Sequence, residues 1–79
     1  MAIEIKTPAF DDPDATAKAV EWLAEVGQAL QTGDRVLEIE TDKAVLAIEA
    51  PAAGVLSETL VGEGDTLASE QPVARMDPR

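Results

Sequence analysis

One lysine near the middle of the chain, Lys43, combines a reactive side chain with an unusual position. It is flanked by the acidic residues Glu40 and Asp42, and it is the only lysine that follows Lys18 in the sequence. A solitary primary amine between carboxylates suits an enzyme that must find and modify one side chain. The alternative interpretation is a solvated, charged turn with no further function.

Two strand-like segments meet at this lysine and would determine where it is displayed. Apolar and acidic residues alternate over residues 35–41, and a second segment rich in apolar residues runs over 44–50. A connection of only Asp42 and Lys43 is the shortest hairpin loop, and it predicts that Lys43 stands at the outermost point of the molecule. Favoured two-residue loops contain glycine, which this one lacks.

The length and composition restrict the kinds of protein that this chain can be. Its 79 residues suffice for one small domain, and they include neither cysteine nor histidine. The usual ligands of zinc and iron–sulfur sites are therefore missing, and so are the residues for disulfides or histidine-based catalysis. We expect no catalytic residue and no metal site.

The chain is strongly acidic, with a formal net charge of -10 at pH 7. A surface of this sign repels nucleic acid and anionic lipid. No apolar run reaches membrane-spanning length, and the first residues lack the pattern of a secretory signal. We expect a soluble monomer inside the cell. The charge either serves solubility or helps partner enzymes to select Lys43.

The segments on either side of the hairpin are typical of short strands separated by turns. Alternation of apolar and charged residues predicts a strand over residues 2–6. Turn-forming residues predict interruptions at 32–34, 51–54, 62–65 and 70–71, and the strands between the later turns are expected at 55–61, 66–69 and 72–76. Most of the chain is thus expected to be β-structure.

Residues 14–30 admit two interpretations. Their apolar residues fall at helical spacing and Asp14 could cap a helix, so the local sequence favours an amphipathic helix. The competing strand would place Val20, Trp22, Ala24 and Val26 on one face, and Ala19, Glu21, Leu23 and Glu25 on the other.

A weak internal repeat relates the two halves of the chain. Val20 and Glu25-Val26-Gly27 recur as Val55 and Leu60-Val61-Gly62, and further along Leu30, Val36 and Ile39 recur as Leu67, Val73 and Met76. Two similar halves suggest two similar sheets related by a pseudo-twofold axis, each too small to bury its apolar face alone. Packed face to face, such sheets would form a compact β-sandwich.

The run Glu40-Thr41-Asp42-Lys43-Ala44 matches the attachment motif of lipoyl domains, and the chain resembles that family over nearly its whole length. Other matching residues are Ile3-Glu4-Ile5-Lys6, Pro8, Gly33-Asp34, Ala50-Pro51, Gly54 and Val73. The resemblance implies an all-β fold, a flattened barrel or sandwich of two four-stranded antiparallel sheets with pseudo-twofold symmetry. It favours a strand within residues 14–30. It also implies a lipoyl domain over residues 1–76, followed by the start of an interdomain linker at 77–79.

The resemblance to this family also implies a function. Lys43 would carry lipoic acid in amide linkage, presented by its neighbours Glu40, Thr41, Asp42 and Ala44. The domain would be a carrier with no catalytic activity of its own, within the acyltransferase of a 2-oxo acid dehydrogenase complex. Its swinging arm would serve a thiamine diphosphate-dependent decarboxylase, the acyltransferase core and an FAD-dependent dihydrolipoamide dehydrogenase, once a lipoyl ligase or transferase had attached the arm.

The loop after the first strand lies beside the modified lysine in lipoyl domains. Phe10, Asp11 and Asp12 occupy that loop here, so the resemblance implies a role for them in partner recognition. The alternative is that acidic residues in a loop are simply solvated.

The resemblance is greatest to lipoyl domains of the 2-oxoglutarate dehydrogenase succinyltransferase, which implies succinyl as the carried group. The segments 11–13 and 23–27 depart from that group's usual residues, so a pyruvate, branched-chain or acetoin complex remains an alternative. Biotin carriers usually have methionine on both sides of the lysine, where this chain has Asp42 and Ala44, and the glycine-cleavage carrier is longer. An unmodified structural β-hairpin module and a small acidic helical interaction domain remain alternatives from other classes.

Overall fold

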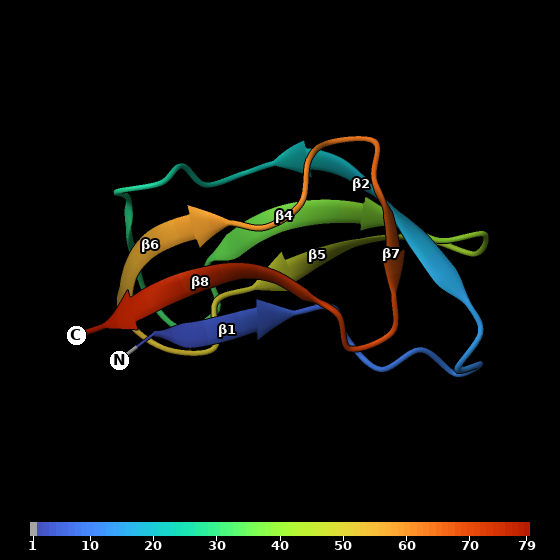
Figure 1. Cartoon of the computed structure of the whole chain (residues 1–79), viewed down its shortest axis with the longest axis horizontal. Helices are drawn as coiled ribbons and strands as arrows, with labels where there is room; N and C mark the ends of the chain where they lie inside the picture. The colour runs from blue at the N-terminus through green and yellow to red at the C-terminus, as the bar shows by residue number, and fades with distance from the viewer. Residues whose placement is uncertain (1) are drawn as a thin grey trace.

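Residues 2–79, the part of the chain that the computed structural model describes, contain eight β-strands, joined by turns and loops, and no helix. The strands form two four-stranded antiparallel sheets, with the orders β1-β8-β6-β3 and β5-β4-β2-β7, which pack face to face (Figure 1). The strands are β1 (Ile3–Lys6), β2 (Thr16–Trp22), β3 (Ala29–Leu30), β4 (Arg35–Glu40), β5 (Val45–Glu49), β6 (Gly54–Thr59), β7 (Thr66–Ala68) and β8 (Pro72–Pro78). The predicted all-β sandwich is confirmed, and most strand ends differ from the expected ones by one or two residues. The exceptions are β2, which lies earlier than the strand laid out over residues 19–26, and β3, which was not predicted as a separate strand.

The two sheets are equivalent in topology. The order β1-β8-β6-β3 corresponds, position by position, to the order β5-β4-β2-β7. The corresponding strands are β1 and β5, β8 and β4, β6 and β2, and β3 and β7, and the two members of each pair are four strands apart in the chain. The later residues of the internal repeat are all buried, with exposed fractions of 3% or less: Leu30 and Leu67, Val36 and Val73, and Ile39 and Met76. The pseudo-twofold arrangement predicted from the sequence is therefore confirmed.

The hydrophobic core lies between the two sheets. Its largest fully buried side chains are Ile5, Val36, Leu37, Ile39, Leu56, Leu67, Val73 and Met76. A sheet of four short strands cannot remove its apolar face from water by itself, so burial of these side chains stabilises the contact between the sheets. The packed body then holds the turns at its two ends in place.

The helix that the local sequence favours within residues 14–30 is absent. The segment forms β2 and β3 with an irregular stretch between them. β2 is a central strand, paired with β4 along one edge and with β7 along the other. Pairing along both edges satisfies the main-chain polar groups of β2, and this tertiary gain outweighs a weak local preference for helix. The strand favoured by the family resemblance is confirmed.

The faces predicted for this strand are partly wrong, because the chain bulges at Val20. The pairing of β2 with β4 shifts between Ala19 and Glu21, so that one extra residue is accommodated. Beyond an extra residue, each side chain of a strand points to the face opposite the one that simple alternation predicts. Ala19 is therefore buried while Val20 is 38% exposed. Ala24 is buried and Trp22 packs against the core, as expected for one face, but Val26 is exposed because the strand has already ended.

The chain ends and the β4–β5 hairpin lie at opposite ends of an elongated body (Figure 1). β1 pairs with β8 so that Ile3 lies opposite Met76, and the body measures 34 × 19 × 19 Å. β8 continues to Pro78, which pairs with Gly54, whereas the domain boundary expected after Met76 stays a prediction. Nowhere in residues 2–79 is there a helix with the length and hydropathy needed to cross a membrane.

Candidate functional site

Lys43 is exposed in the turn that joins β4 to β5, at the end of the molecule away from the chain ends. Glu40 pairs with Val45 at the end of the strand ladder. One residue further on, the Thr41 N–H donates a hydrogen bond of 2.8 Å to the Ala44 carbonyl oxygen. Asp42 and Lys43 are thus the two residues beyond the last main-chain bond, and the predicted hairpin is confirmed.

The hydroxyl of Thr41 closes this turn in the absence of glycine. Asp42 and Lys43 are not among the residues with positive φ, so the turn lacks the backbone twist that two-residue hairpins favour. Thr41 Oγ1 accepts hydrogen bonds from the N–H groups of Lys43, at 3.2 Å, and Ala44, at 3.1 Å. It also donates to the Ala44 carbonyl oxygen at 3.1 Å. In the sequence Thr41 stands out only as part of a motif, although a threonine next to a turn is itself a signal for such bonding.

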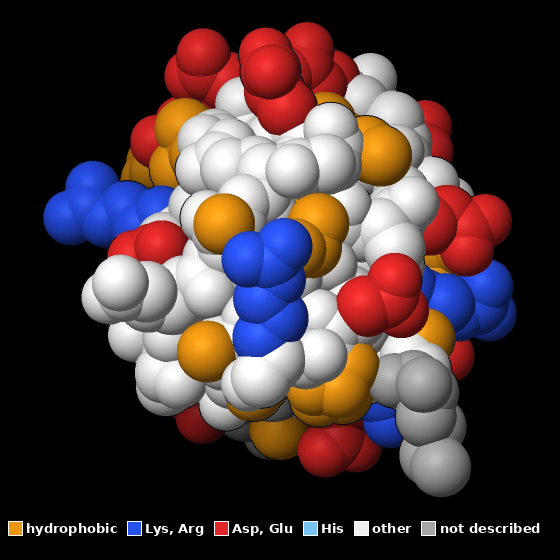
Figure 2. All heavy atoms as spheres, turned by 90° about the vertical axis from the view of Figure 1, so that its left-hand side faces the viewer, with side chains coloured by type: hydrophobic (Ala, Val, Ile, Leu, Met, Phe, Trp, Pro, Cys, Tyr) orange, Lys and Arg blue, Asp and Glu red, His pale blue; other side chains and the backbone are white. Residues whose placement is uncertain are grey.

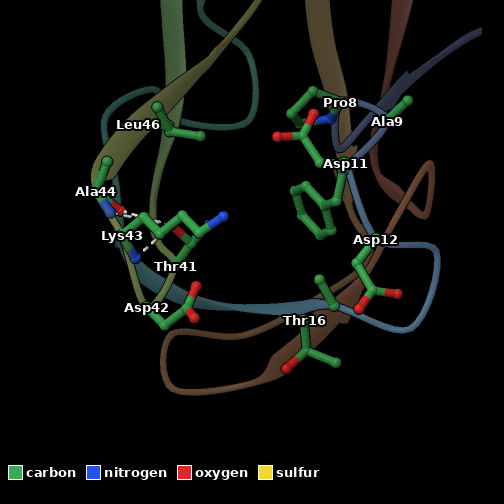
Figure 3. A pocket seen from close by; sticks show the side chains of 12 residues that line it. Pro8, Ala9, Asp11, Asp12, Thr16, Thr41, Asp42, Lys43, Ala44 and Leu46 are labelled. Carbon is green, nitrogen blue, oxygen red and sulfur yellow. Dashed lines mark hydrogen bonds between the residues drawn. The ribbon is translucent and has the colours of Figure 1, made fainter.

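A groove of about 440 Å³ separates the hairpin turn from the loop that follows β1 (Figure 3). Lys43 extends its side chain from the hairpin toward the wall that carries Pro8 and Asp11 (Figure 3). The lining residues are Pro8, Ala9, Phe10, Asp11, Asp12, Ala15, Thr16, Thr41, Asp42, Lys43, Ala44 and Leu46. The structure therefore brings the three loop residues predicted for recognition, Phe10, Asp11 and Asp12, to the same groove as Lys43.

Sequence reasoning missed several lining residues of the groove, among them Ala15, Thr16 and Leu46. None of them has a side chain whose type indicates a binding role. They line the groove only because a loop and a hairpin that are far apart in the chain come together in the fold. Glu40, by contrast, was expected near the site but does not line the groove. It pairs with Lys18 of β2 and with Val45 of β5, which places it on the exposed outer side of the sheet.

The far wall of the groove is fixed to the body of the domain. Thr7, at the end of β1, is buried and donates its hydroxyl to the Ala68 carbonyl oxygen at 2.6 Å. The Phe10 N–H donates to Ser69 Oγ at 2.9 Å. Within the loop, Asp12 Oδ1 accepts from the Asp14 N–H at 2.9 Å, so Asp12 has a structural role whether or not it contacts a partner. Both walls of the groove are thus held by hydrogen bonds.

Negative charge by itself does not single out the hairpin. Figure 2, which looks onto the end that carries the chain ends, shows acidic side chains on several sides there as well. Within residues 2–79 the ion pairs within 4.0 Å join Arg75 to Glu4 and Glu58, and none involves Lys43. The same residues contain no cluster of three acidic side chains suited to a metal ion. What distinguishes the hairpin is an exposed amine in a fixed turn.

The arrangement suits acceptance of a group rather than catalysis. A primary amine in a fixed turn can form an amide with an activated carboxyl group. The chain contains no histidine or cysteine that could act as its base or nucleophile.

Comparisons with known proteins agree with this geometry. The biotin/lipoyl family model, described as "Biotin-requiring enzyme", matches residues 3–76. The succinyltransferase component of the 2-oxoglutarate dehydrogenase complex of Pseudomonas aeruginosa is 38% identical over 77 residues, which are 98% of this chain and 19% of that protein. The acetyltransferase component of the pyruvate dehydrogenase complex of Zymomonas mobilis is 39% identical over 77 residues, 96% of this chain and 18% of that protein. The chain thus spans about a fifth of the length of these curated relatives.

A solved structure of similar size gives the same result. The lipoyl domain of the 2-oxoglutarate dehydrogenase complex from Azotobacter vinelandii superposes with a TM-score of 0.74 at 33% identity, covering 95% of each chain. The family match, the relatives and this structure all cover nearly the whole chain. The chain therefore belongs to the biotin/lipoyl attachment family, as a non-catalytic carrier module similar to the lipoyl domains of 2-oxo acid dehydrogenase complexes.

Proposed function

We propose that this domain carries lipoic acid in amide linkage on Lys43 Nζ and moves acyl groups within a 2-oxo acid dehydrogenase complex. The observation that supports this most is the placement of Lys43. It is an exposed lysine in a hairpin turn closed by hydrogen bonds, at the end of the body opposite the chain ends. An arm attached there would extend away from the end of the body where the chain ends lie.

The residues around Lys43 fit a lipoyl group. No carboxylate in residues 2–79 forms an ion pair with the amine, so attachment breaks no ion pair. When bound, the dithiolane of lipoic acid supplies the chemistry, by accepting an acyl group with two electrons and releasing it to a thiol acceptor. The domain supplies the position of the amine and the surface around it. Asp42 and Ala44 beside the lysine favour lipoate over biotin, whose carriers usually have methionine at both places.

The partners follow from the same proposal. They are a thiamine diphosphate-dependent decarboxylase, the acyltransferase core, an FAD-dependent dihydrolipoamide dehydrogenase and the enzyme that attaches the lipoyl group. Tethering to the core keeps the arm at high effective concentration near each enzyme without tight binding. Phe10, Asp11 and Asp12, on the groove wall opposite Lys43, would contact the decarboxylase. The complex would act in the bacterial cytoplasm or the mitochondrial matrix.

Succinyl is the acyl group that we propose, and acetyl is the second candidate. The relative from Pseudomonas aeruginosa and the solved lipoyl domain from Azotobacter vinelandii both belong to 2-oxoglutarate dehydrogenase complexes. The relative from Zymomonas mobilis belongs to a pyruvate dehydrogenase complex at nearly the same identity. Reductive acylation of the lipoylated domain by each of the two decarboxylases separates the candidates. A faster reaction with the pyruvate enzyme would overturn the succinyl assignment.

Intact-mass spectrometry tests the attachment itself. We expect one lipoyl adduct after co-expression with a lipoate ligase, lost in Lys43→Ala and retained in Lys18→Ala. Lys18 is a suitable control because it is an exposed lysine on the neighbouring strand, where it pairs with Glu40. A wild-type chain without an adduct, or a Lys43→Ala chain that keeps it, would overturn the proposal.

A further inference from the structure

We propose that Thr41 is a positioning residue for modification of Lys43, because its hydroxyl group holds the main chain on both sides of the lysine. The inference rests on the proposed attachment of lipoic acid to Lys43. It gives a specific role to Thr41, which is not the residue that is modified and does not react with the lipoyl carboxyl group.

The hydrogen bonds of the turn converge on one oxygen atom. Thr41 Oγ1 accepts from the N–H of Lys43 and from the N–H of Ala44, and it donates to the Ala44 carbonyl oxygen. The dashed lines in Figure 3 mark bonds of this cluster. In an ordinary two-residue hairpin the main-chain carbonyl of the first flanking residue would accept from the N–H of the second. Here the hydroxyl of Thr41 accepts that hydrogen bond from Ala44 instead.

Both sides of the turn are consequently fixed to the end of the strand ladder. The Thr41 N–H is bonded to the Ala44 carbonyl oxygen at 2.8 Å, and the Thr41 side chain holds the N–H of the lysine itself. Without the hydroxyl, the main chain at Asp42 and Lys43 would sample several conformations, because no glycine sets the turn type. An attaching enzyme would then have to order these residues when it binds.

The reaction that this order favours is amide formation. An ATP-dependent ligase joins the lipoyl carboxyl group to AMP and releases pyrophosphate. Lys43 Nζ then attacks the carbonyl carbon of that mixed anhydride. The new C–N bond forms, the C–O bond to the AMP phosphate breaks, and AMP and one proton leave. Thr41 takes no part in these bonds. Its hydroxyl group determines the main-chain position from which Lys43 Nζ reaches the carbonyl carbon.

Three variants test the proposal. Thr41→Val keeps the shape of the side chain but removes the hydroxyl, whereas Thr41→Ser keeps the hydroxyl. Thr59→Val is the matched control, because Thr59 is an exposed threonine at the end of β6 whose hydroxyl makes no hydrogen bond to the described residues. The measurements are kcat and KM of a purified lipoate ligase for each chain, with ATP and lipoate saturating. Amide hydrogen exchange at Lys43 and Ala44 is measured on the same chains before modification.

We expect Thr41→Val to lower kcat/KM for attachment about tenfold, mainly through a higher KM, the scale of one or two lost hydrogen bonds. Exchange at the Lys43 and Ala44 amides should become faster in this variant, and the melting temperature should change little because the turn is exposed. Thr41→Ser and Thr59→Val should behave like the wild type.

Unchanged kinetics in Thr41→Val would overturn the positioning role, and so would an equal loss in Thr41→Ser or Thr59→Val. These results differ from failure of the proposed function, in which the wild-type chain itself accepts no lipoyl group. That outcome would remove both proposals, even if the amide exchange showed the turn to be held by Thr41.

Discussion

Glu21 on β2 lies directly opposite Glu38 on β4, so two carboxylates of like charge face each other across a strand pair. Like charges in this relation destabilise a sheet. The chain as a whole has a formal net charge of -10 at pH 7, which adds to the repulsion between them. On β8, by contrast, Arg75 pairs with Glu58 of the neighbouring strand, and Arg75 Nη1 lies 2.9 Å from Glu58 Oε1.

This difference predicts opposite effects for two charge substitutions. Glu21→Lys should stabilise the domain by about 0.5 kcal/mol, because it replaces a repulsive pair by an attractive one. Glu58→Gln should destabilise it by a similar or smaller amount, about 0.3–0.5 kcal/mol, because its ion pair is exposed. Urea unfolding at low ionic strength measures both, and both effects should shrink in 0.5 M salt, about the range where such charges are screened. Destabilisation by Glu21→Lys would contradict the prediction.

Gly54, at the start of β6, is buried and lies directly against the main chain of β8. A Cβ atom on this residue would overlap the Asp77 carbonyl oxygen and would lie 2.8 Å from Met76 Cε. Gly54→Ala should therefore destabilise the domain by about 1–3 kcal/mol, because main chain must move to make room. Gly62→Ala is the control, since a Cβ there would meet only Asp65 Oδ2, at 3.8 Å. Equal unfolding free energies for the two variants would contradict the prediction, because they would mean that the main chain of β8 can move away from residue 54 at little cost.

Thr7 anchors the loop that forms one wall of the groove. Its buried hydroxyl donates to the Ala68 carbonyl oxygen and accepts from the Gln71 N–H at 2.7 Å. Thr7→Val should cost about 1–3 kcal/mol of stability, because it leaves both main-chain groups without a partner. Thr7→Ser keeps both hydrogen bonds and should cost less. The free energy of unfolding distinguishes the two, and a larger loss for the serine variant would mean that the methyl group matters more than the hydroxyl.

The acidic residues beside Lys43 should differ in their effect on the decarboxylase. Asp42 lines the groove, whereas Glu40 pairs with Lys18 on the outer side of the sheet. Asp42→Asn should therefore slow reductive acylation of the lipoylated domain a few-fold, about the effect of one charge at the rim of an interface, and Glu40→Gln should slow it less. Both variants should fold, because both residues are exposed. Equal rates for both variants and the wild type would remove any role for these charges in recognition.

The sequence predicted the strands and the exposed lysine well, because both depend on local patterns. Alternation around Leu37 and Ile39 marks β4, and the motif around Lys43 marks the turn. The bulge at Val20 could not be predicted in this way, because it depends on how β2 meets β4. The groove was equally hidden, since Phe10 and Leu46 line the same groove only once a loop and a hairpin fold toward each other. For residues 14–30, strand pairing outweighed helical periodicity.

The separation of Lys43 from the paired strands β1 and β8 has a mechanical consequence. The packed sheets between them form an elongated body, 34 Å in its longest dimension and 19 Å in the other two. A rotation of this body about the end where the chain ends lie moves the amine along a longer arc than any residue near the pivot. The domain as a whole would then contribute to the reach of the carrier, and the lipoyl arm proposed on Lys43 would add only the last, flexible part of it.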